Sequence, residues 1–196
     1  MRGMLHDDAK AFVAQTKADD TVVKTEKIKR YDCKFTCTKK CRFRYYLKYC
    51  WNASMSTIVW IGLNPSTADY YKLDPTLYRV LYYSYKCGFG SFVMLNAYAH
   101  VSTDPHMLHH KRSVGRYNDA TIKEFLSQNI DVVCAWSNCG RRRQNELAQI
   151  IGMNEIYCLG VDGRGYPLHP FRKCDDLERH KMHFIEDHKG NSLAAM

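Results

Sequence analysis

Apolar and polar segments alternate along this chain in a way that predicts strands and helices in turn. Short apolar runs typical of buried strands lie at residues 58–63, 91–99, 131–136 and 155–159. Apolar side chains recur at helical spacing in the segments between them, at residues 73–87, 118–128 and 143–151. Gly88 and Gly152 are expected to end the first and the last of these helices. The alternation predicts an α/β fold, a three-layer sandwich around a central, mainly parallel sheet.

The segments outside this alternation are polar or basic. Residues 1–30 form a polar N-terminal lead-in whose residues 7–17 favour a helix. Basic and aromatic residues alternate loosely from Tyr31 to Trp51, which indicates a strand pair with a turn at Lys39-Lys40. Residues 176–196 are polar and are expected to form a loosely packed tail. All of these segments are assigned to a single domain of residues 1–196.

Length and cysteine content favour a cytoplasmic location. A chain of 196 residues can bury a core without disulfides, and its nine cysteines are an odd number. Residues 1–40 are polar and charged and contain no apolar signal segment. No apolar run reaches the length of a transmembrane helix, and the basic segments have no clear apolar helical face for a membrane surface. We therefore expect a monomer with mostly reduced thiols and no membrane contact.

The net charge of +9 is concentrated in two segments. Ten Lys and Arg residues stand against two acids between Lys24 and Lys48, and aromatic residues are interleaved with them. Phosphates would bind such cations, and bases would stack on the rings, so we expect a nucleic acid as the partner. Scattered charges are more often a solvated face, but the clustering favours a polyanion. The expected contacts to nucleic acid are Lys39, Lys40, Arg42, Arg141, Arg142 and Arg143.

Polar or aromatic residues stand at the ends of all four predicted strands. Because the carboxyl ends of parallel strands meet at one edge of a sheet, a ligand crevice is expected there. An ordinary turn between strand and helix remains the alternative for the first of these ends. Trp136 is more often a core residue than a base-stacking platform, although its place at a strand end favours the second role. The residues at these ends are Gly62, Asn64, Pro65, Ser66, Asn96, Tyr98, Trp136, Ser137 and His169.

The cysteine spacing does not favour a metal site. Cys33, Cys37 and Cys41 are separated by three residues each, which is not a zinc-finger spacing, and Cys50 follows further on. Buried thiols are the expected state of these side chains, while zinc or an iron–sulfur cluster stays open as the alternative. We expect no metal and no other cofactor.

Five motifs resemble domain-of-unknown-function family 1643. They are LNPSTAD at residues 63–69, DPT at 74–76, LNAY at 95–98 with TDP at 103–105, VGRYND at 114–119 and LGVDGRGYPLHP at 159–170. The similarity spans residues 41–172. The chain departs from the family at residues 99–102, where a shorter arginine-containing link is usual, and at Ser137, where glycine is usual.

That family in turn resembles the mismatch-type members of the uracil-DNA glycosylase superfamily, which implies a uracil-DNA-glycosylase-like fold. Gly62, Asn64 and Pro65 match a Gly-x-Asn-Pro motif whose asparagine positions the water that attacks the sugar C1′. His169-Pro170 matches a His-Pro loop that presses on the minor groove and stabilises the departing base. Asn96 matches the asparagine that recognises the base.

The resemblance implies a monofunctional DNA glycosylase acting on double-stranded DNA with a flipped base or on single strands. A departing pyrimidine is an anion, so a donor at His169 would stabilise it, while Asn64 positions water. Asp69 and Asp74 are the alternative general bases. The base pocket would consist of Gly62, Pro65, Ser66, Asn96, Tyr98 and Trp136. The wedge that replaces the flipped base would come from Leu168, Pro170 and Phe171.

Ser66 bears on which base is chosen. Uracil-specific members of that superfamily carry a tyrosine directly after the motif proline, and its ring blocks groups on the pyrimidine C5. A serine leaves room for a bulky modified base such as glucosylated hydroxymethylcytosine of phage DNA, unless Tyr70 or Tyr71 fills the space. Such an activity would serve antiviral defence or repair. The alternatives are a nucleotide- or base-modifying enzyme on the same scaffold and a non-catalytic nucleic-acid-binding module.

Overall fold

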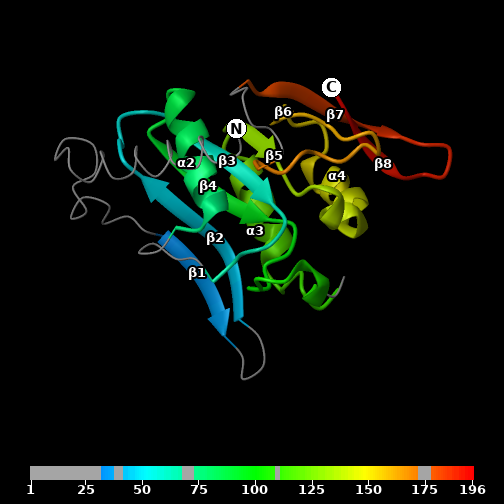
Figure 1. The fold of residues 1–196 in the computed structure, drawn as a ribbon, viewed down its shortest axis with the longest axis horizontal. Helices are drawn as coiled ribbons and strands as arrows, with labels where there is room; N and C mark the ends of the chain where they lie inside the picture. Colours follow the sequence, from blue (N-terminus) through cyan, green and yellow to red (C-terminus); the bar gives the residue numbers. More distant parts are fainter. Residues whose placement is uncertain (1–31, 38–41, 68–72, 109–110, 172–177) are drawn as a thin grey trace.

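The computed structural model describes residues 32–37, 42–67, 73–108, 111–171 and 178–196 (Figure 1). The strands are β1 (Asp32–Cys37), β2 (Arg42–Cys50), β3 (Thr57–Gly62), β4 (Ser91–Asn96), β5 (Val132–Cys134), β6 (Ile156–Cys158), β7 (His180–Glu186) and β8 (Ser192–Ala195). The α-helices are α2 (Pro75–Lys86), α3 (Asn118–Leu126) and α4 (Gln144–Ile151). Two short 3₁₀ helices are η1 (Pro105–Met107) and η2 (Asn138–Arg143).

The strands form a mixed sheet in the order β1-β2-β4-β3-β5-β6-β7-β8. The central strands β4, β3, β5 and β6 pair in parallel. The outer pairings, β1 with β2, β2 with β4, β6 with β7 and β7 with β8, are antiparallel. The α/β class and the parallel centre are thus confirmed, as is the strand pair between Tyr31 and Trp51. The two hairpins, β1–β2 and β7–β8, are antiparallel because short connections cannot join parallel neighbours.

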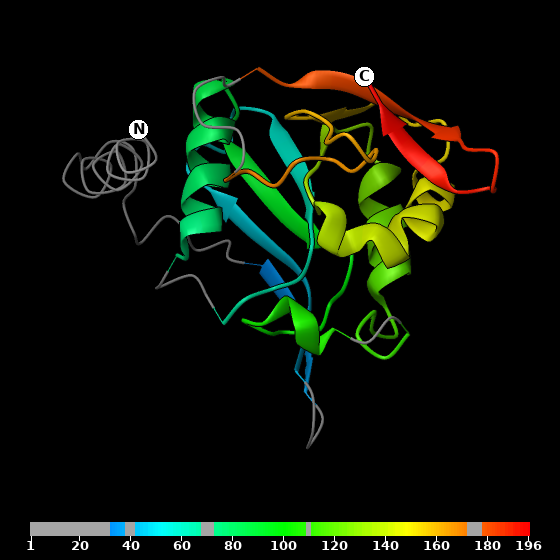
Figure 2. The same cartoon turned by 45° about the vertical axis from the view of Figure 1, so that its right-hand side comes forward.

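Helices cover both faces of the sheet, so the three-layer arrangement is confirmed (Figures 1 and 2). On one face, Leu77 and Val80 of α2 pack with Trp60 of β3. On the other face, Ile122 of α3 and Leu147 of α4 pack with strand residues of the second core cluster. Alternate side chains of a strand point to opposite faces, so a central strand buried on both sides is apolar throughout. None of the described helices is long and apolar enough to cross a membrane.

The C-terminal segment is not a loose tail, and that prediction is wrong. Residues 180–186 and 192–195 form the β7–β8 hairpin, and β7 extends the sheet beside β6. Met182 and Ala194 of this hairpin are buried in the core. An edge hairpin buries only part of each strand, so its composition stays polar although β7 pairs with both β6 and β8.

Asn118 is the first residue of α3 but is not its N-cap. Tyr117 occupies the cap position and makes no side-chain cap bond. Asn118 is buried, and its Nδ2 donates to the backbone oxygens of Asn96 at 2.9 Å and Ala97 at 3.2 Å. The asparagine therefore ties α3 to the end of β4. The helix predicted at residues 7–17 and the turn at Lys39-Lys40 lie outside the described residues.

Candidate active site

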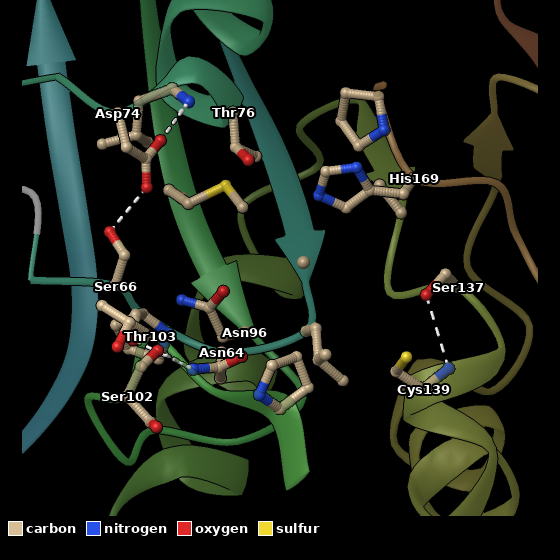
Figure 3. A pocket seen from close by; sticks show the side chains of 18 of the residues that line it. Asn64, Ser66, Asp74, Thr76, Asn96, Ser102, Thr103, Ser137, Cys139 and His169 are labelled. Atoms are coloured by element: carbon tan, nitrogen blue, oxygen red, sulfur yellow. Dashed lines mark hydrogen bonds between the residues drawn. The ribbon is translucent and has the colours of Figure 1, made fainter. Parts of the chain in front are cut away.

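A cavity of about 350 Å³ lies at the carboxyl edge of β3, β4 and β5, on the face of the sheet that α2 covers (Figure 3). The residues that line it come from seven separate stretches of the chain. Those that the sequence had singled out are Gly62, Asn64, Pro65, Ser66, Asp74, Asn96, Ser137, His169 and Pro170. The carboxyl edge of the parallel strands therefore brings Asn64, Asn96 and His169 to one cavity, as expected.

Asn96 carries an unsatisfied acceptor at this cavity. Its side chain is 2% exposed, and its Oδ1 has no hydrogen-bond partner among the described residues. A Cβ at Gly62 would lie 3.1 Å from that oxygen and 2.4 Å from Cε of Met94, so glycine keeps the space beside Asn96 open. A buried acceptor without a donor costs about 1–3 kcal/mol. A ligand with an N–H group would remove this cost.

Asn64 is held rigidly at the cavity wall. Its Nδ2 donates to the backbone oxygen of Pro65 at 3.0 Å and to that of Ser102 at 2.7 Å. The backbone N–H of Ser102 returns a bond of 2.9 Å to the Pro65 oxygen. These bonds fix the amide orientation and leave Oδ1 as an acceptor for water, a task of positioning rather than proton removal. Sequence reasoning missed Ser102, although it ends the segment where the chain departs from its family.

His169 projects into the cavity on the side where Thr76 lies (Figure 3). Its Nδ1 accepts the backbone N–H of Phe171 at 3.2 Å, so the neutral ring carries its proton on Nε2. The imidazole also stacks on the Phe171 ring, with centroids 5.9 Å apart and planes at 7°. The ring orientation and the tautomer are therefore both set by the residues that follow it.

Arg79 supports the His-Pro loop and was not anticipated from the sequence. It is buried in α2, and its Nη1 donates to the backbone oxygen of Pro170 at 3.3 Å. Its guanidinium lies 4.8 Å from the centre of the Phe171 ring. The one signal in the sequence that could have indicated a buried role for Arg79 is its charge among the apolar positions of this helix. Pro170 is buried at the cavity wall, whereas Leu168 and Phe171 are half-buried, so Pro170 is badly placed to act as a wedge.

Asp74 lines the cavity, but its carboxylate has a structural task. Oδ1 accepts the backbone N–H of Leu77 at 2.8 Å as the N-cap of α2, and Oδ2 accepts the hydroxyl of Ser66 at 2.5 Å. Proton abstraction by Asp74 would compete with both bonds. Asn64 is therefore better placed than Asp74 to act on water. Asp69, the other alternative base, lies outside the described residues.

Tyr98 and Trp136 do not line the cavity, so both predicted substrate contacts are wrong. Tyr98 is 2% exposed, and burial raises the pKa of its hydroxyl. Trp136 has no exposed surface, its Nε1 donates to Oε1 of Gln144 at 3.0 Å, and its ring stacks on Phe184. Both side chains belong to the core on the α3 and α4 face, whereas the cavity lies on the α2 face. Position at a strand end does not determine which face a side chain takes.

Arg143 is not available to nucleic acid, and that prediction is wrong as well. It is 3% exposed, its Nε donates to the backbone oxygen of Ala97 at 3.2 Å, and its Nη2 pairs with Asp119. Arg42, Arg141 and Arg142 are exposed, as expected of phosphate contacts. Lys39 and Lys40 lie outside the described residues, as do Cys41 and the side chains of Cys33 and Cys37.

Ser137 stands at the cavity in a backbone conformation that almost only glycine adopts. Its φ is 57° and its ψ is −178°, while its N–H donates to Pro167 O at 2.9 Å and its Oγ accepts the N–H of Cys139 at 3.4 Å. Such strain costs about 1–3 kcal/mol, and losing the serine cap to glycine costs only a few tenths.

Ser137→Gly is therefore expected to raise the free energy of unfolding by about 1 kcal/mol, measured by urea denaturation. Asn129→Gly, at φ 52° on the surface, should gain less because asparagine tolerates this region; a destabilised Ser137→Gly protein would contradict the assignment of strain.

The fold and the site together define an α/β protein with a cavity, lined by both polar and apolar residues, at the carboxyl edge of its parallel strands. The chain belongs to the family described as protein of unknown function (DUF1643), whose model matches residues 44–171. This confirms the family resemblance and nearly reproduces its expected range. No curated protein and no solved structure matches the chain significantly. The further resemblance to uracil-DNA glycosylases has no support from these comparisons.

Proposed function

We propose that this protein is a DNA glycosylase that hydrolyses the N-glycosidic bond of a pyrimidine, with the cavity as its base pocket. The observation that carries the proposal is the buried Oδ1 of Asn96 beside Gly62, which has no hydrogen-bond partner in the part of the chain that the structure describes. A flipped pyrimidine offers an N–H to this acceptor, from its ring or from an exocyclic amine. The cavity volume of about 350 Å³ falls within the range of roughly 300–1,000 Å³ for small-molecule sites.

The fixed orientations of Asn64 and His169 support this reaction. In the proposed step, the oxygen of a water held by Asn64 bonds to the sugar C1′, and the bond from C1′ to the base nitrogen breaks. The electron pair leaves with the base, so negative charge develops on its N1 and on its O2 carbonyl oxygen, and His169 Nε2–H donates to that oxygen. The attacking water loses its proton to solvent, and the base anion takes one up.

The similarity of two motifs to the uracil-DNA glycosylase superfamily adds support, since both matched segments line the cavity. They are Gly62-x-Asn64-Pro65 and His169-Pro170. Ser66 also lines the cavity, in the position where a blocking tyrosine would stand. The substrate we propose is accordingly a C5-substituted pyrimidine, such as glucosylated hydroxymethylcytosine of phage DNA, excised in antiviral defence or repair.

A panel of DNAs with single modified bases tests the proposal. Oligonucleotides, single-stranded and duplex, would carry uracil, thymine, 5-methylcytosine, 5-hydroxymethylcytosine or its glucosylated form. Abasic sites would be scored by alkaline cleavage and released bases by mass spectrometry. The proposal expects both products from at least one C5-substituted base. A base altered but not released would instead favour a base-modifying enzyme, and tight binding without chemistry would favour a non-catalytic module.

Ser66→Tyr is expected to shift substrate preference away from C5-substituted bases. A tyrosine ring would fill the space that a C5 substituent needs, and steric exclusion of a small group is worth about tenfold to two-hundredfold in kcat/KM. Steady-state rates on substituted and unsubstituted bases measure the ratio. Ser66→Ala is the matched control, because it also loses the bond to Asp74 but leaves the space empty. An unchanged ratio in Ser66→Tyr would remove the modified-base assignment and leave the enzyme class standing.

A further inference from the structure

A basic surface lies beyond η2 from the candidate active site. Two open cavities form it, and exposed cations line both of them. One, of about 560 Å³, is lined by residues that include Arg141, Arg142 and Arg164. The other, of about 470 Å³, is lined by residues that include Lys111, Arg112 and Arg116. Glu146 lines both, so the two cavities adjoin across the start of α4, and together they make the α4 basic surface.

Buried polar side chains hold the segments of this surface in place. Gln144 is buried, and its Nε2 donates to the backbone oxygens of Gly165 and Ser192, each at 2.7 Å. Asn145 Oδ1 accepts the backbone N–H of Ser192 at 2.8 Å. On the other side of α4, Arg143 ties the end of η2 to α3 through Asp119. Figure 2 shows η2 and α4 lying between the β7–β8 hairpin and the segment that precedes α3. The segments that carry the exposed cations are therefore fixed relative to one another by these hydrogen bonds and this ion pair.

The exposed cations outnumber the carboxylates that line the two cavities. The carboxylates are Asp119, Glu146 and Asp187, against the six exposed cations. Asp119 pairs with the buried Arg143. Asp187 accepts hydrogen bonds from the side chain and backbone of Asn191, which hold the pKa of its carboxyl below the ordinary value. Five of the six cations are arginines, whose planar forks match phosphate oxygens in pairs.

We propose that the α4 basic surface binds the phosphate backbone of the DNA strand that carries the target base. The inference rests on the proposed function, because it takes the ligand of the cavity to be a base within a polymer. Ser137 and Cys139 line the active-site cavity at the start of η2, and Arg141 and Arg142 stand near the end of the same helix. A 3₁₀ helix rises about 2 Å per residue, so only about 4–6 Å along its axis separates Cys139 from these arginines. A strand whose base enters the cavity would meet them within its neighbouring nucleotides.

Charge reversal on the intact protein tests this surface. The variants are K111E/R112E/R116E and R141E/R142E/R164E, with K86E/K123E/K181E as a control of equal charge change in which none of the three lysines lines either cavity. Fluorescence anisotropy with unmodified single-stranded and duplex 30-mers gives the affinity across a range of salt concentrations. Each surface variant is expected to weaken binding by about tenfold or more and to lower the salt slope by about 2–3, because each phosphate contact adds about 0.9 to that slope. The control should change affinity by less than about threefold, since distant exposed charges are screened.

The outcomes separate this inference from the proposed function. Triple substitutions to glutamine at the same positions should weaken DNA binding less than the glutamate variants do, with the control again the least affected. Circular dichroism checks that every variant folds. The inference would be overturned if the surface variants bound DNA with the affinity and the salt dependence of the unmodified protein. Base release by the unmodified protein would in that case still support the proposed function. If the surface variants lose DNA binding but the unmodified protein releases no base from any modified DNA, the α4 basic surface is supported as a DNA-binding surface and the glycosylase activity is rejected. Equal displacement of DNA by poly-glutamate at matched charge would also overturn it, in favour of an acidic polypeptide partner.

Discussion

Replacing His169 by alanine is expected to slow base release by about two to three orders of magnitude, with DNA affinity little changed. The reason is the loss of the Nε2–H donor at the departing base, and one such donor in a preorganised site is worth about 10²–10³ in rate. Single-turnover release of base from the substrate identified in the panel measures the effect. His183→Ala is the control, because this histidine is exposed on β7 and does not line the cavity.

Asn64→Ala is expected to cost a comparable factor through the loss of the positioned water. This variant also loses the two hydrogen bonds to the backbone oxygens of Pro65 and Ser102, so its rate must be corrected for the folded fraction. The two losses should affect the rate rather than affinity, since neither side chain is expected to bind phosphate. Unchanged base release in both alanine variants would reject the assignment of the reaction to this cavity.

Arg143→Ala is expected to lower the free energy of unfolding by about 2–3 kcal/mol. The substitution removes a buried charged donor to the Ala97 oxygen and leaves Asp119 without its cation. The value stays below that of a fully buried pair, because the Asp119 side chain is 43% exposed. Chemical denaturation measures it, with Arg142→Ala as the matched control on the adjacent exposed position.

Arg142→Ala should change stability by less than about 0.5 kcal/mol and should weaken DNA binding instead. The two neighbouring arginines would thus separate, one as a structural residue and the other as a phosphate contact. If Arg143→Ala were as stable as the unmodified protein, the ion pair with Asp119 would not hold η2 against α3. The fixed arrangement of the segments of the α4 basic surface would then not depend on Arg143.

Sequence reasoning anticipated the candidate site in part. Asn64, Asn96 and His169 could be found because each follows or ends an apolar strand run, and parallel strands bring such ends to one edge. Arg79 and Ser102 could not be found this way, since their roles depend on contacts to Pro170 and Asn64, which lie 91 and 38 residues away along the chain. The strain at Ser137 is likewise a property of its backbone angles.

The sequence by itself determined the α/β class, the order of the central elements and the family of this protein, because hydrophobic period, turn residues and motifs are local properties. Only the tertiary structure decided which face each side chain takes and which distant segments meet. It placed Tyr98 and Trp136 in the core opposite the cavity, buried Arg143 beside two exposed arginines, and paired the polar C-terminal segment as an edge hairpin. It also brought cations from three separate segments around the start of α4. These outcomes follow from packing and from the need to satisfy buried polar groups, which are set by non-local contacts that no local pattern encodes.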